Sequence, residues 1–337
     1  MTQLKTDNSP LTTDLDPATA AFLEGMRAAG GKPMDETPIE EVRANIRAAS
    51  AQLAPPLADV ARVEDRRIPA AGGDFGVRVY LPHGGTARPI VVYFHGGGWA
   101  AGDVDTHDAT ARYYAANAGV VVVSVDYRQP PEHKFPAAVD DSYAAVEWAV
   151  AHAREIGGDE TRIAVAGDSA GGNLAAVVCQ LAKQRGGPRI AYQLLVYPTV
   201  DLRDPVDDPA YPSRHQFGGG EYFLSMRDME WFRSLYVTDP TRESSDVRLS
   251  PIAEADLSGL PPALVVTAGC DVLRDEGRAY AGRLSAAGGP VEYRCFDGTI
   301  HAFMSFAGAI PLGLEALSFV ASRLKSSLAL SNNSRMS

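Results

Sequence analysis

A strand, a sharp turn and a helix follow one another between residues 162 and 179, with a serine in the turn. The apolar run Ile163-Ala164-Val165-Ala166 predicts a buried strand, and the residues from 173 onward favour a helix. Gly167 and Gly171 stand two residues before and two residues after Ser169. A side chain at either glycine would collide with the neighbouring strand or helix, so this spacing is typical of a nucleophile elbow. We therefore expect Ser169 to be a nucleophile at the apex of the turn.

The helix after the turn points its N-terminus, with free N–H groups and a partial positive charge, at the space above Ser169. An anionic intermediate would form there, and the N–H of Ala170 is the natural donor to it. We expect Asp168, beside the serine, to support the site. The alternative is a glycine-rich turn that contains a serine by chance. A dinucleotide fingerprint is excluded, because the turn lacks its Gly-x-Gly opening.

The charge of the chain restricts its partners. The 337 residues carry a net charge of −11 and no basic cluster, which argues against nucleic acid and anionic lipid as partners. No stretch reaches the ~18 apolar residues of a membrane span, and residues 1–10 lack the apolar core of a secretion signal. We expect a cytoplasmic protein without membrane insertion. The three cysteines have no metal-ligand spacing, and we expect buried thiols.

Strand and helix patterns alternate along most of the chain. Two β-rich runs at 63–68 and 76–81, with a turn at Gly72-Gly73-Asp74, predict an antiparallel start to a sheet. Alternation with helices then predicts right-handed crossovers and a mostly parallel sheet. The class expected is α/β. The later apolar strands are expected at residues 90–94, 120–125, 163–166, 190–197, 263–268 and 291–296.

Ser169 needs a base, and the base needs a group that orients it. Functional side chains in such a sheet emerge at the carboxyl ends of strands. Asp271 follows the strand at 263–268, and His301 follows the strand at 291–296. The chain order Ser, Asp, His is that of the α/β-hydrolases. We expect His301 to take the serine proton and Asp271 to hold the imidazole.

Each of these assignments has an alternative. Asp275 is the other candidate acid, but it lies about one turn into the following helix. Four other histidines are candidate bases, although none follows a strand late in the chain. They are His95, His107, His133 and His215.

A glycine loop follows the apolar strand at 90–94. Glycine at positions 96 to 98 lets bare backbone approach a carbonyl oxygen, and we expect the N–H groups of Gly96 and Gly97 to bind an oxyanion together with that of Ala170. His95 is expected beneath the loop, where it would hydrogen-bond the loop into shape, and Gly98 is expected to support it. No cluster of histidine and carboxylate residues has metal-ligand spacing.

Five motifs together resemble the hormone-sensitive-lipase-like family of α/β-hydrolase carboxylesterases over about residues 60–325. They are His95-Gly96-Gly97-Gly98, Asp126-Tyr127-Arg128-x-x-Pro131-Glu132-His133-x-Phe135-Pro136-Ala137, Gly167-Asp168-Ser169-Ala170-Gly171-Gly172, Asp271-x-Leu273-Arg274-Asp275-Glu276 and His301-Ala302-Phe303. The chain departs from the family pattern at Gln129-Pro130, where Leu-Ala is usual, and at Cys270 before the acid.

The resemblance implies an eight-stranded, mostly parallel sheet whose second strand is antiparallel, with a helical cap. It also implies a serine hydrolase that cleaves short- to medium-chain acyl esters without a cofactor. A small-molecule ester is then the expected partner. Members of the family often form dimers, which leaves a homodimer open for this chain.

Two regions lie outside the strand–helix alternation. Asp16-Pro17 and the capping-box pattern at Thr37-Pro38-Ile39-Glu40 each begin an amphipathic helix, and a long segment separates Pro198 from the next buried strand. We expect N-terminal cap helices at 14–56, a catalytic domain at 57–199 and 259–325, a cap insertion at 200–258, and flexible tails at 1–13 and 326–337.

Aromatic residues are expected to line an acyl pocket between the cap and the serine, although any of them could equally belong to the core of the insertion. The residues expected there are Trp99, Phe217, Tyr222 and Phe223. Other functions stay open for the same machinery, namely cleavage of amides, lactones or acetylated small molecules. A non-catalytic ligand-binding protein on this scaffold is disfavoured by the presence of His301. A true lipase is disfavoured by the lack of an extended apolar surface.

Overall fold

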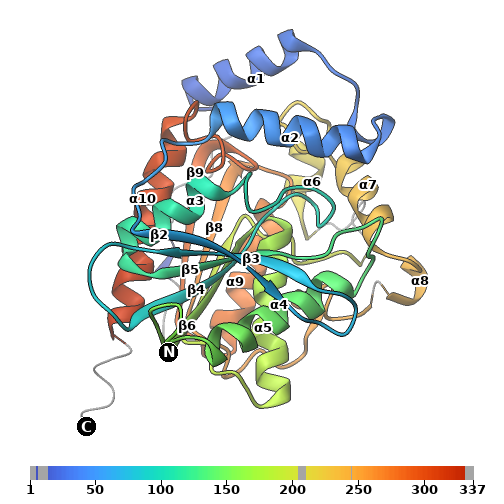
Figure 1. Ribbon diagram of the computed structural model, residues 1–337. Helices are drawn as coiled ribbons and strands as arrows, with labels where there is room; N and C mark the ends of the chain where they lie inside the picture. The colour runs from blue at the N-terminus through green and yellow to red at the C-terminus, as the bar shows by residue number, and fades with distance from the viewer. Residues whose placement is uncertain (1–4, 7–13, 204–209, 244, 331–337) are drawn as a thin grey trace.

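The computed structural model describes residues 5–6, 14–203, 210–243 and 245–330 of the chain. Its centre is a single sheet to which the chain contributes nine strands in the described residues (Figure 1). The strands are β1 (Lys5–Thr6), β2 (Arg62–Ile68), β3 (Phe75–Leu81), β4 (Arg88–Phe94), β5 (Val121–Asp126), β6 (Gly158–Asp168), β7 (Tyr192–Val196), β8 (Ala263–Cys270) and β9 (Val291–Ile300).

The strand order is β1-β9-β8-β7-β6-β4-β5-β3-β2. β3 runs antiparallel to both of its neighbours, β2 and β5, and the strands from β5 across to β9 pair in parallel. A hydrogen bond of 3.0 Å from the N–H of Gly73 to the carbonyl of Ala70 closes the turn before β3. The mostly parallel sheet with an antiparallel second strand is therefore confirmed for β2 to β9.

Both ends of the described chain are more ordered than expected. Lys5–Thr6 lies within the segment that we expected to be a tail, and it pairs in parallel with β9 at the edge of the sheet. The last helix, α10 (Pro311–Leu330), continues past residue 326, where we expected the second tail to begin. The rest of the two tails lies outside the described residues.

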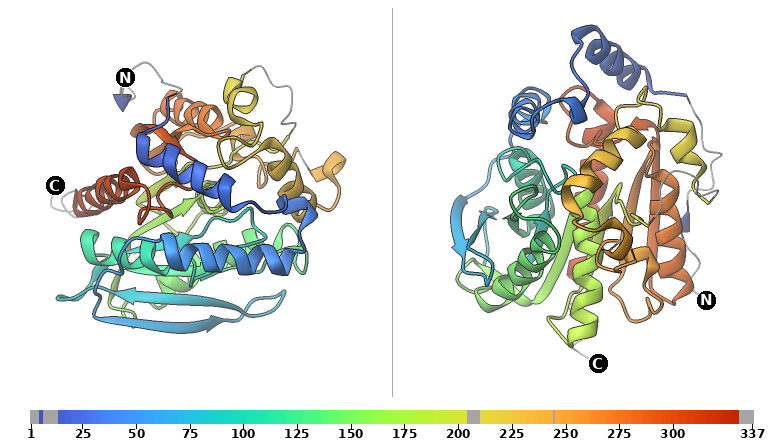
Figure 2. Two further views of the ribbon diagram at one scale, coloured as in Figure 1. Left: turned by 90° about the horizontal axis from the view of Figure 1, so that it is seen from above. Right: turned by 90° about the vertical axis from the view of Figure 1, so that its right-hand side faces the viewer.

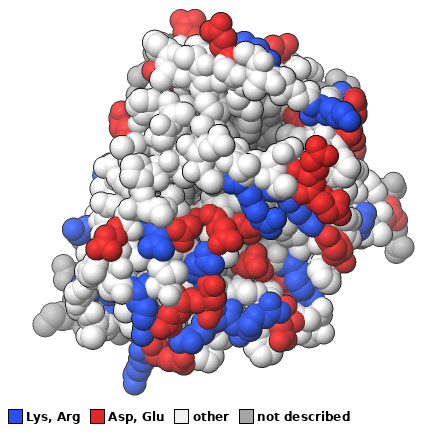
Figure 3. Space-filling view, turned by 45° about the horizontal axis from the view of Figure 1, so that its top comes forward, with Lys and Arg blue, Asp and Glu red and all other residues white. Residues whose placement is uncertain are grey.

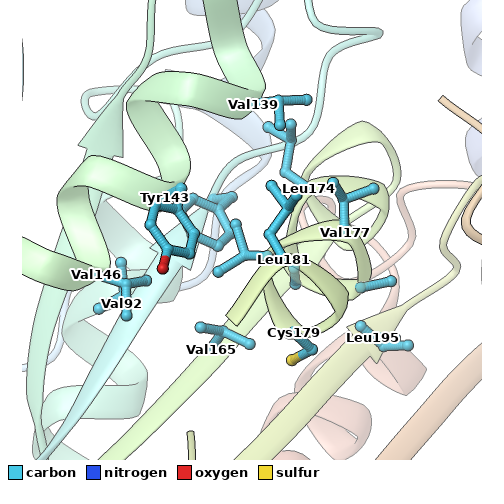
Figure 4. Packing of buried hydrophobic residues seen from close by; sticks show 14 of the residues in the cluster. Val92, Val139, Tyr143, Val146, Val165, Leu174, Val177, Cys179, Leu181 and Leu195 are labelled. Carbon is cyan, nitrogen blue, oxygen red and sulfur yellow. The ribbon is translucent and has the colours of Figure 1, made fainter. Parts of the chain in front are cut away.

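Helices cover both faces of the sheet. α4 (Ala137–Ala151), α5 (Ala170–Arg185) and α9 (Arg274–Ala286) cover one face, and α3 (Asp108–Tyr114), the π-helical turn Ala115–Gly119 and α10 cover the other. Because successive strand residues point to opposite faces, Val121 and Val123 join the first core and Val122 joins the second. Figure 4 shows the first core, where Tyr143 and Val146 of α4 pack beside α5.

The N-terminal helices and the long insertion gather at one end of the sheet (Figures 1 and 2). The helices are α1 (Pro17–Ala29), α2 (Ile39–Leu53), α6 (Pro212–Phe217) and α7 (Met226–Tyr236), with a 3₁₀ turn at Met34–Glu36. The insertion continues through α8 (Pro240–Glu243) to a 3₁₀ turn at Pro251–Ala253, where the carbonyl of Pro251 accepts from Gln180 of α5 at 2.8 Å. The segments are joined by polar contacts. Arg227 of α7 forms ion pairs with Asp35 at 2.7 Å and Glu36 at 2.8 Å, and Arg27 donates to the carbonyl of Glu221 at 2.7 Å.

Of the two helix caps expected near the N-terminus, one is present and the other is absent. Asp16 caps α1 as predicted, because its carboxylate accepts from the N–H groups of Ala18 and Thr19 at 3.0 and 3.1 Å. The capping box predicted at Thr37 is wrong. The hydroxyl of Thr37 donates instead to the carbonyl of Pro33 at 2.8 Å, and α2 begins without a side-chain cap.

None of the helices in the described part of the chain has both the length and the apolar character that crossing a membrane requires.

Candidate active site

Ser169 lies in a turn whose backbone geometry requires glycine neighbours. Its φ of 55° and ψ of −119° lie in a region that costs a non-glycine residue on the order of 1–3 kcal/mol. A Cβ atom at Gly171 would overlap the carbonyl oxygen of Phe94, and one at Gly167 would overlap the carbonyl oxygen of Gly171. The glycine spacing of the sequence is therefore a steric requirement of the junction between β6 and α5.

Ser169, His301 and Asp271 form a continuous hydrogen-bonded chain. The Nε2 atom of His301 lies 2.9 Å from Oγ of Ser169, and its Nδ1 atom lies 2.8 Å from Oδ2 of Asp271. Asp271 and His301 are buried, and each follows the end of a strand, β8 or β9. Because a carboxylate only accepts hydrogen bonds, Nδ1 carries a proton and Nε2 is left to accept from the serine. The geometry suits removal of the serine proton.

The alternative acid, Asp275, is occupied elsewhere. Its carboxylate accepts from the N–H of Ser213 in α6 at 2.7 Å and pairs with Arg274 at 2.8 Å. Asp275 therefore joins the cap insertion to α9, whereas Asp271 faces His301.

The alternative bases also lie in other surroundings. His133 and His215 are exposed. His95 and His107 are buried side by side, with ring centroids 5.5 Å apart, and the Nε2 atom of His107 lies 3.4 Å from Oδ2 of Asp168. His301 is the histidine whose ring nitrogen lies against Ser169.

The glycine loop corrects one expectation. The N–H of Gly96, which we expected to bind an oxyanion, donates to Oδ1 of Asp168 at 3.0 Å. A Cβ atom at Gly96 would overlap the same carboxylate, which explains the glycine there. Among the described residues, the N–H groups of Gly97, Gly98 and Ala170 donate to no protein acceptor. These three groups are the donors that the loop and the elbow leave for an oxyanion.

His95 fixes the peptide plane that carries the N–H of Gly97. Its Nδ1 atom lies 2.8 Å from the carbonyl oxygen of Gly96. Burial first, and then the positive charge of His107, lowers the pKa of His95 to about 4, so the ring is neutral and donates through Nδ1. In a trans peptide the carbonyl and the next N–H point in opposite directions, so holding the Gly96 carbonyl aims the N–H of Gly97 away from His95.

Helix α7 packs directly on the glycine loop through two aromatic residues one turn apart. A Cβ atom at Gly98 would overlap the ring of Phe232, so that ring lies against the Gly98 backbone. One turn on, Tyr236 stacks on Trp99 with ring centroids 4.5 Å apart. We had not assigned Phe232 to the site. Its sequence signal was the apolar stripe of α7, which does not reveal what the stripe covers.

The four residues expected in an acyl pocket have different surroundings. Phe217 is fully buried in the core, beneath Tyr222 and beside the guanidinium of Arg274, so its assignment to the pocket is wrong. Trp99 is 4% exposed and is stacked on Tyr236. Tyr222 and Phe223 are half-buried, and Phe223 lies edge-on to Phe306 of the segment after His301.

The N-terminal helices also touch the segment that carries His301. The N–H of Asp16 donates to the carbonyl of Gly298 at 2.9 Å, and the N–H of Gly308 donates to the carbonyl of Leu53 at 2.8 Å. At Gly298 and at Gly308 a Cβ atom would overlap backbone of these N-terminal segments. The ends of α1 and α2 therefore hold the histidine segment on both sides.

The cysteine side chains take no part in the hydrogen-bonded chain of Ser169, His301 and Asp271. All three cysteines are buried, and burial raises the pKa of Cys270 to about 11. In the described ranges no three histidine, cysteine or carboxylate side chains lie together as metal ligands would.

Comparison with known proteins places this geometry among esterases. A family model described as alpha/beta hydrolase fold matches residues 91–305. The chain is 44% identical over 298 residues to the carboxylic ester hydrolase LipN of Mycobacterium tuberculosis, covering 86% of this chain and 77% of the relative. It is 35% identical to the ethyl acetate hydrolase of Pseudomonas putida, over 93% of this chain and 99% of the relative.

A solved structure is similarly close. The hyperthermophilic esterase of the archaeon Pyrobaculum calidifontis superposes with a TM-score of 0.87 at 42% identity, covering 93% of this chain and 99% of that one.

Proposed function

Since the chain belongs to the family with the alpha/beta hydrolase fold that matches residues 91–305, we propose that it is a serine carboxylesterase in which Ser169, His301 and Asp271 carry the reaction. The observation that carries the proposal is the unbroken chain from Asp271 through His301 to Oγ of Ser169, with distances of 2.8 and 2.9 Å. The relatives that match nearly the whole chain are ester hydrolases, which supports the same reaction class.

The reaction runs in two half-reactions. His301 Nε2 takes the proton of Ser169 as Oγ bonds to the ester carbonyl carbon, and the carbonyl electron pair moves onto its oxygen. Collapse of this intermediate breaks the bond to the alcohol, which leaves with the proton from His301. Water then attacks the acyl-enzyme and gives a proton to His301. Ser169 regains that proton as the carboxylic acid leaves.

Three backbone donors stabilise the oxyanion in this scheme: the N–H groups of Gly97, Gly98 and Ala170. Removing one donor from such a site typically costs ~10²–10³ in kcat, because the donors are fixed in place before the charge develops. Gly98 thus takes the place that the sequence assigned to Gly96. Asp271 holds the imidazole tautomer and stabilises the cation that forms on His301.

We further propose that the substrates are short- to medium-chain acyl esters and that residues 14–56 and 200–258 act as the cap. One relative is an ethyl acetate hydrolase, and ethyl acetate is a small ester. Packing of Phe232 and Tyr236 on the glycine loop brings bulky side chains close to the reacting carbonyl. The homodimer and the cytoplasmic location stay predictions from the sequence.

The test is hydrolysis of a p-nitrophenyl ester series from acetate to palmitate, combined with intact mass after treatment with a fluorophosphonate. We expect one adduct, mapped to Ser169, and rates that peak at short chains. The Ser169→Ala variant is the control and should show neither. Labelling without ester turnover would contradict the carboxylesterase and point to amides or lactones. A protein that binds esters but is not labelled would contradict the serine mechanism.

A further inference from the structure

A second charged pair lies behind the glycine loop, and the reaction described above does not use it. The Nε2 atom of His107 lies 3.4 Å from Oδ2 of Asp168, and the two side chains are 9% and 8% exposed. The other carboxylate oxygen of Asp168 accepts from the hydroxyl of Tyr93 at 2.5 Å and from the N–H of Gly96 at 3.0 Å. Asp168 thus connects the nucleophile turn, the strand beneath it and the glycine loop.

The polar groups around His107 fit a ring that is protonated on both nitrogens. Its Nδ1 atom lies 2.9 Å from Oγ1 of Thr106, and that hydroxyl already donates its one hydrogen to the carbonyl of Asp103 at 2.8 Å. In this arrangement Oγ1 accepts from Nδ1. The Nε2 atom faces a carboxylate oxygen, which only accepts hydrogen bonds. A protonated ring satisfies both contacts.

The electrostatic surroundings agree with this assignment. Burial alone would lower the pKa of His107, but the charge of Asp168 and the hydrogen bonds to Asp168 and Asp103 together outweigh it and the pKa is raised. Burial alone would raise the pKa of Asp168, but the charge of His107 and the hydrogen bonds from His107 and Tyr93 outweigh it and the pKa is lowered. The charged forms thus stabilise each other.

The position of the pair gives it a consequence for the reaction. Asp168 precedes the nucleophile and holds the peptide next to the N–H donor of Gly97. An unbalanced negative charge there would repel an oxyanion, because like charges in a buried site interact strongly. We propose that His107 and Asp168 are positioning residues that fix the glycine loop through Gly96 and keep the charge behind the oxyanion site neutral. This inference rests on the proposed function, since it assumes an oxyanion beside Gly97.

The test compares His107→Gln with the double variant Asp168→Asn/His107→Gln. His107→Gln leaves the carboxylate uncompensated, so we expect kcat to fall about 10- to 100-fold with KM changed less than about threefold. In the double variant both charges are gone, and the amide oxygen of Asn can still accept from Gly96. We expect kcat to recover at least about fivefold relative to the single variant. Rates are expressed per site titrated by a fluorophosphonate.

A matched control comes from a second buried carboxylate. Asp141 of α4 is fully buried and pairs with Arg128 at 2.6 Å, and its own hydrogen bonds among the described residues go to Arg128 and not to Asp168 or Gly96. Asp141→Asn should lower stability as His107→Gln does and leave kcat per titrated site unchanged. Tyr93→Phe removes one donor to Asp168 without changing any charge, and it should slow turnover less than His107→Gln does. Tyr93→Phe also provides a variant that reports on the loop if His107→Gln does not fold.

Two outcomes would overturn the inference: His107→Gln with unchanged kcat per titrated site, or a double variant slower than the single one, as additive structural damage predicts. If His107→Gln does not fold, an unchanged kcat per titrated site in Tyr93→Phe overturns it. The rate of phosphonylation of Ser169 is measured in parallel for every variant. That rate needs the nucleophile and the oxyanion site but no particular substrate. If the wild-type protein is phosphonylated and hydrolyses no ester, the proposed function fails while the ratios between variants still test the ion pair.

Discussion

At the scale of single residues, the junction between β6 and α5 tolerates no additional atom at Gly171. A Cβ atom there would overlap the carbonyl oxygen of Phe94, so Gly171→Ala must displace backbone. We predict a loss of more than about 3 kcal/mol in the free energy of unfolding, measured by urea titration. Gly282→Ala is the matched control in α9, since a Cβ atom there meets nothing within 4 Å. It should stabilise by about 0.5–1 kcal/mol, because alanine favours a helix over glycine. If Gly171→Ala and Gly282→Ala changed the free energy of unfolding equally, the clash with the Phe94 carbonyl would not be the cause.

Removing the Ser169 hydroxyl should separate activity from folding. Alanine has about the same backbone preferences as serine at a φ of 55°, and the side-chain hydrogen bond that is lost is the one between Oγ and Nε2 of His301. We predict that Ser169→Ala lowers kcat by at least about 10³-fold while the thermal midpoint shifts by less than about 3 °C. Calorimetry and turnover of a short p-nitrophenyl ester measure the two quantities. Retention of more than a few per cent of activity would place the nucleophile elsewhere.

At the scale of secondary-structure elements, a buried ion pair fastens the cap insertion to the catalytic domain. Arg214 of α6 and Glu276 of α9 are 1% and 0% exposed and lie 2.5 Å apart. Glu276 also accepts from the N–H of Val200 at 2.8 Å. Breaking a buried pair from one side leaves an uncompensated charge, so Glu276→Gln should cost about 3–5 kcal/mol in urea unfolding. The exposed pair between Arg227 and Asp35 is the control, and Asp35→Asn should change stability little. Equal losses from the two variants would argue against a role for burial.

The elements that could be predicted from sequence are those specified by local patterns. Buried strands such as β5 show as runs of valine, and the α1 start shows as Asp16 before proline. The start of α2 was predicted at the right place but with the wrong cap, because Thr37 turns back to the carbonyl of Pro33 instead of capping the helix. The pairing of Lys5–Thr6 with β9 joins segments that lie far apart in the sequence, and no local pattern predicts such a pair.

At the scale of the whole molecule, some residues of the candidate site could be predicted from the sequence and others could not. Ser169, Asp271 and His301 could be found because each directly follows a strand and all strands of a parallel sheet end on one side. The role of Gly96 could not, because its N–H is turned toward the carboxylate of Asp168, a residue of another strand.

The surface over the site shows the same limit of sequence reasoning. On the face that includes the top of Figure 1, side chains without charge form a broad, hollowed area, whereas acidic and basic side chains mix below it (Figure 3). This arrangement depends on how α1, α2 and the insertion meet, which residue order alone does not specify.

The stability of the whole protein should fall in acid because His95 is buried as a neutral ring. Its pKa is about 4 in the folded protein, against an ordinary value of 6.5, owing first to burial and then to the charge of His107. Between pH 6.5 and 4 the unfolded chain therefore binds a proton that the folded chain does not. The neutral His95 ring therefore contributes its full stabilisation above pH 6.5. That contribution falls by about 3 kcal/mol as the pH is lowered to 4.

His107 acts in the opposite sense, and this makes the prediction specific to one residue. Because its folded pKa is raised, its stabilising contribution is present below pH 6.5 and is lost as the pH rises through the folded value. Urea unfolding of His95→Gln should thus lose less stability than the wild type between pH 7 and 4.5. Tyr143→Phe is the control. It removes the 2.6 Å hydrogen bond from the Tyr143 hydroxyl to the carbonyl of Gly187, which involves no histidine, and it should lower stability at every pH without changing the slope. If the free energy of unfolding falls with pH equally in the wild type and in His95→Gln, burial of this ring does not cause the acid sensitivity. Glutamine cannot take up a proton, so equal slopes would mean that the proton is bound by another group.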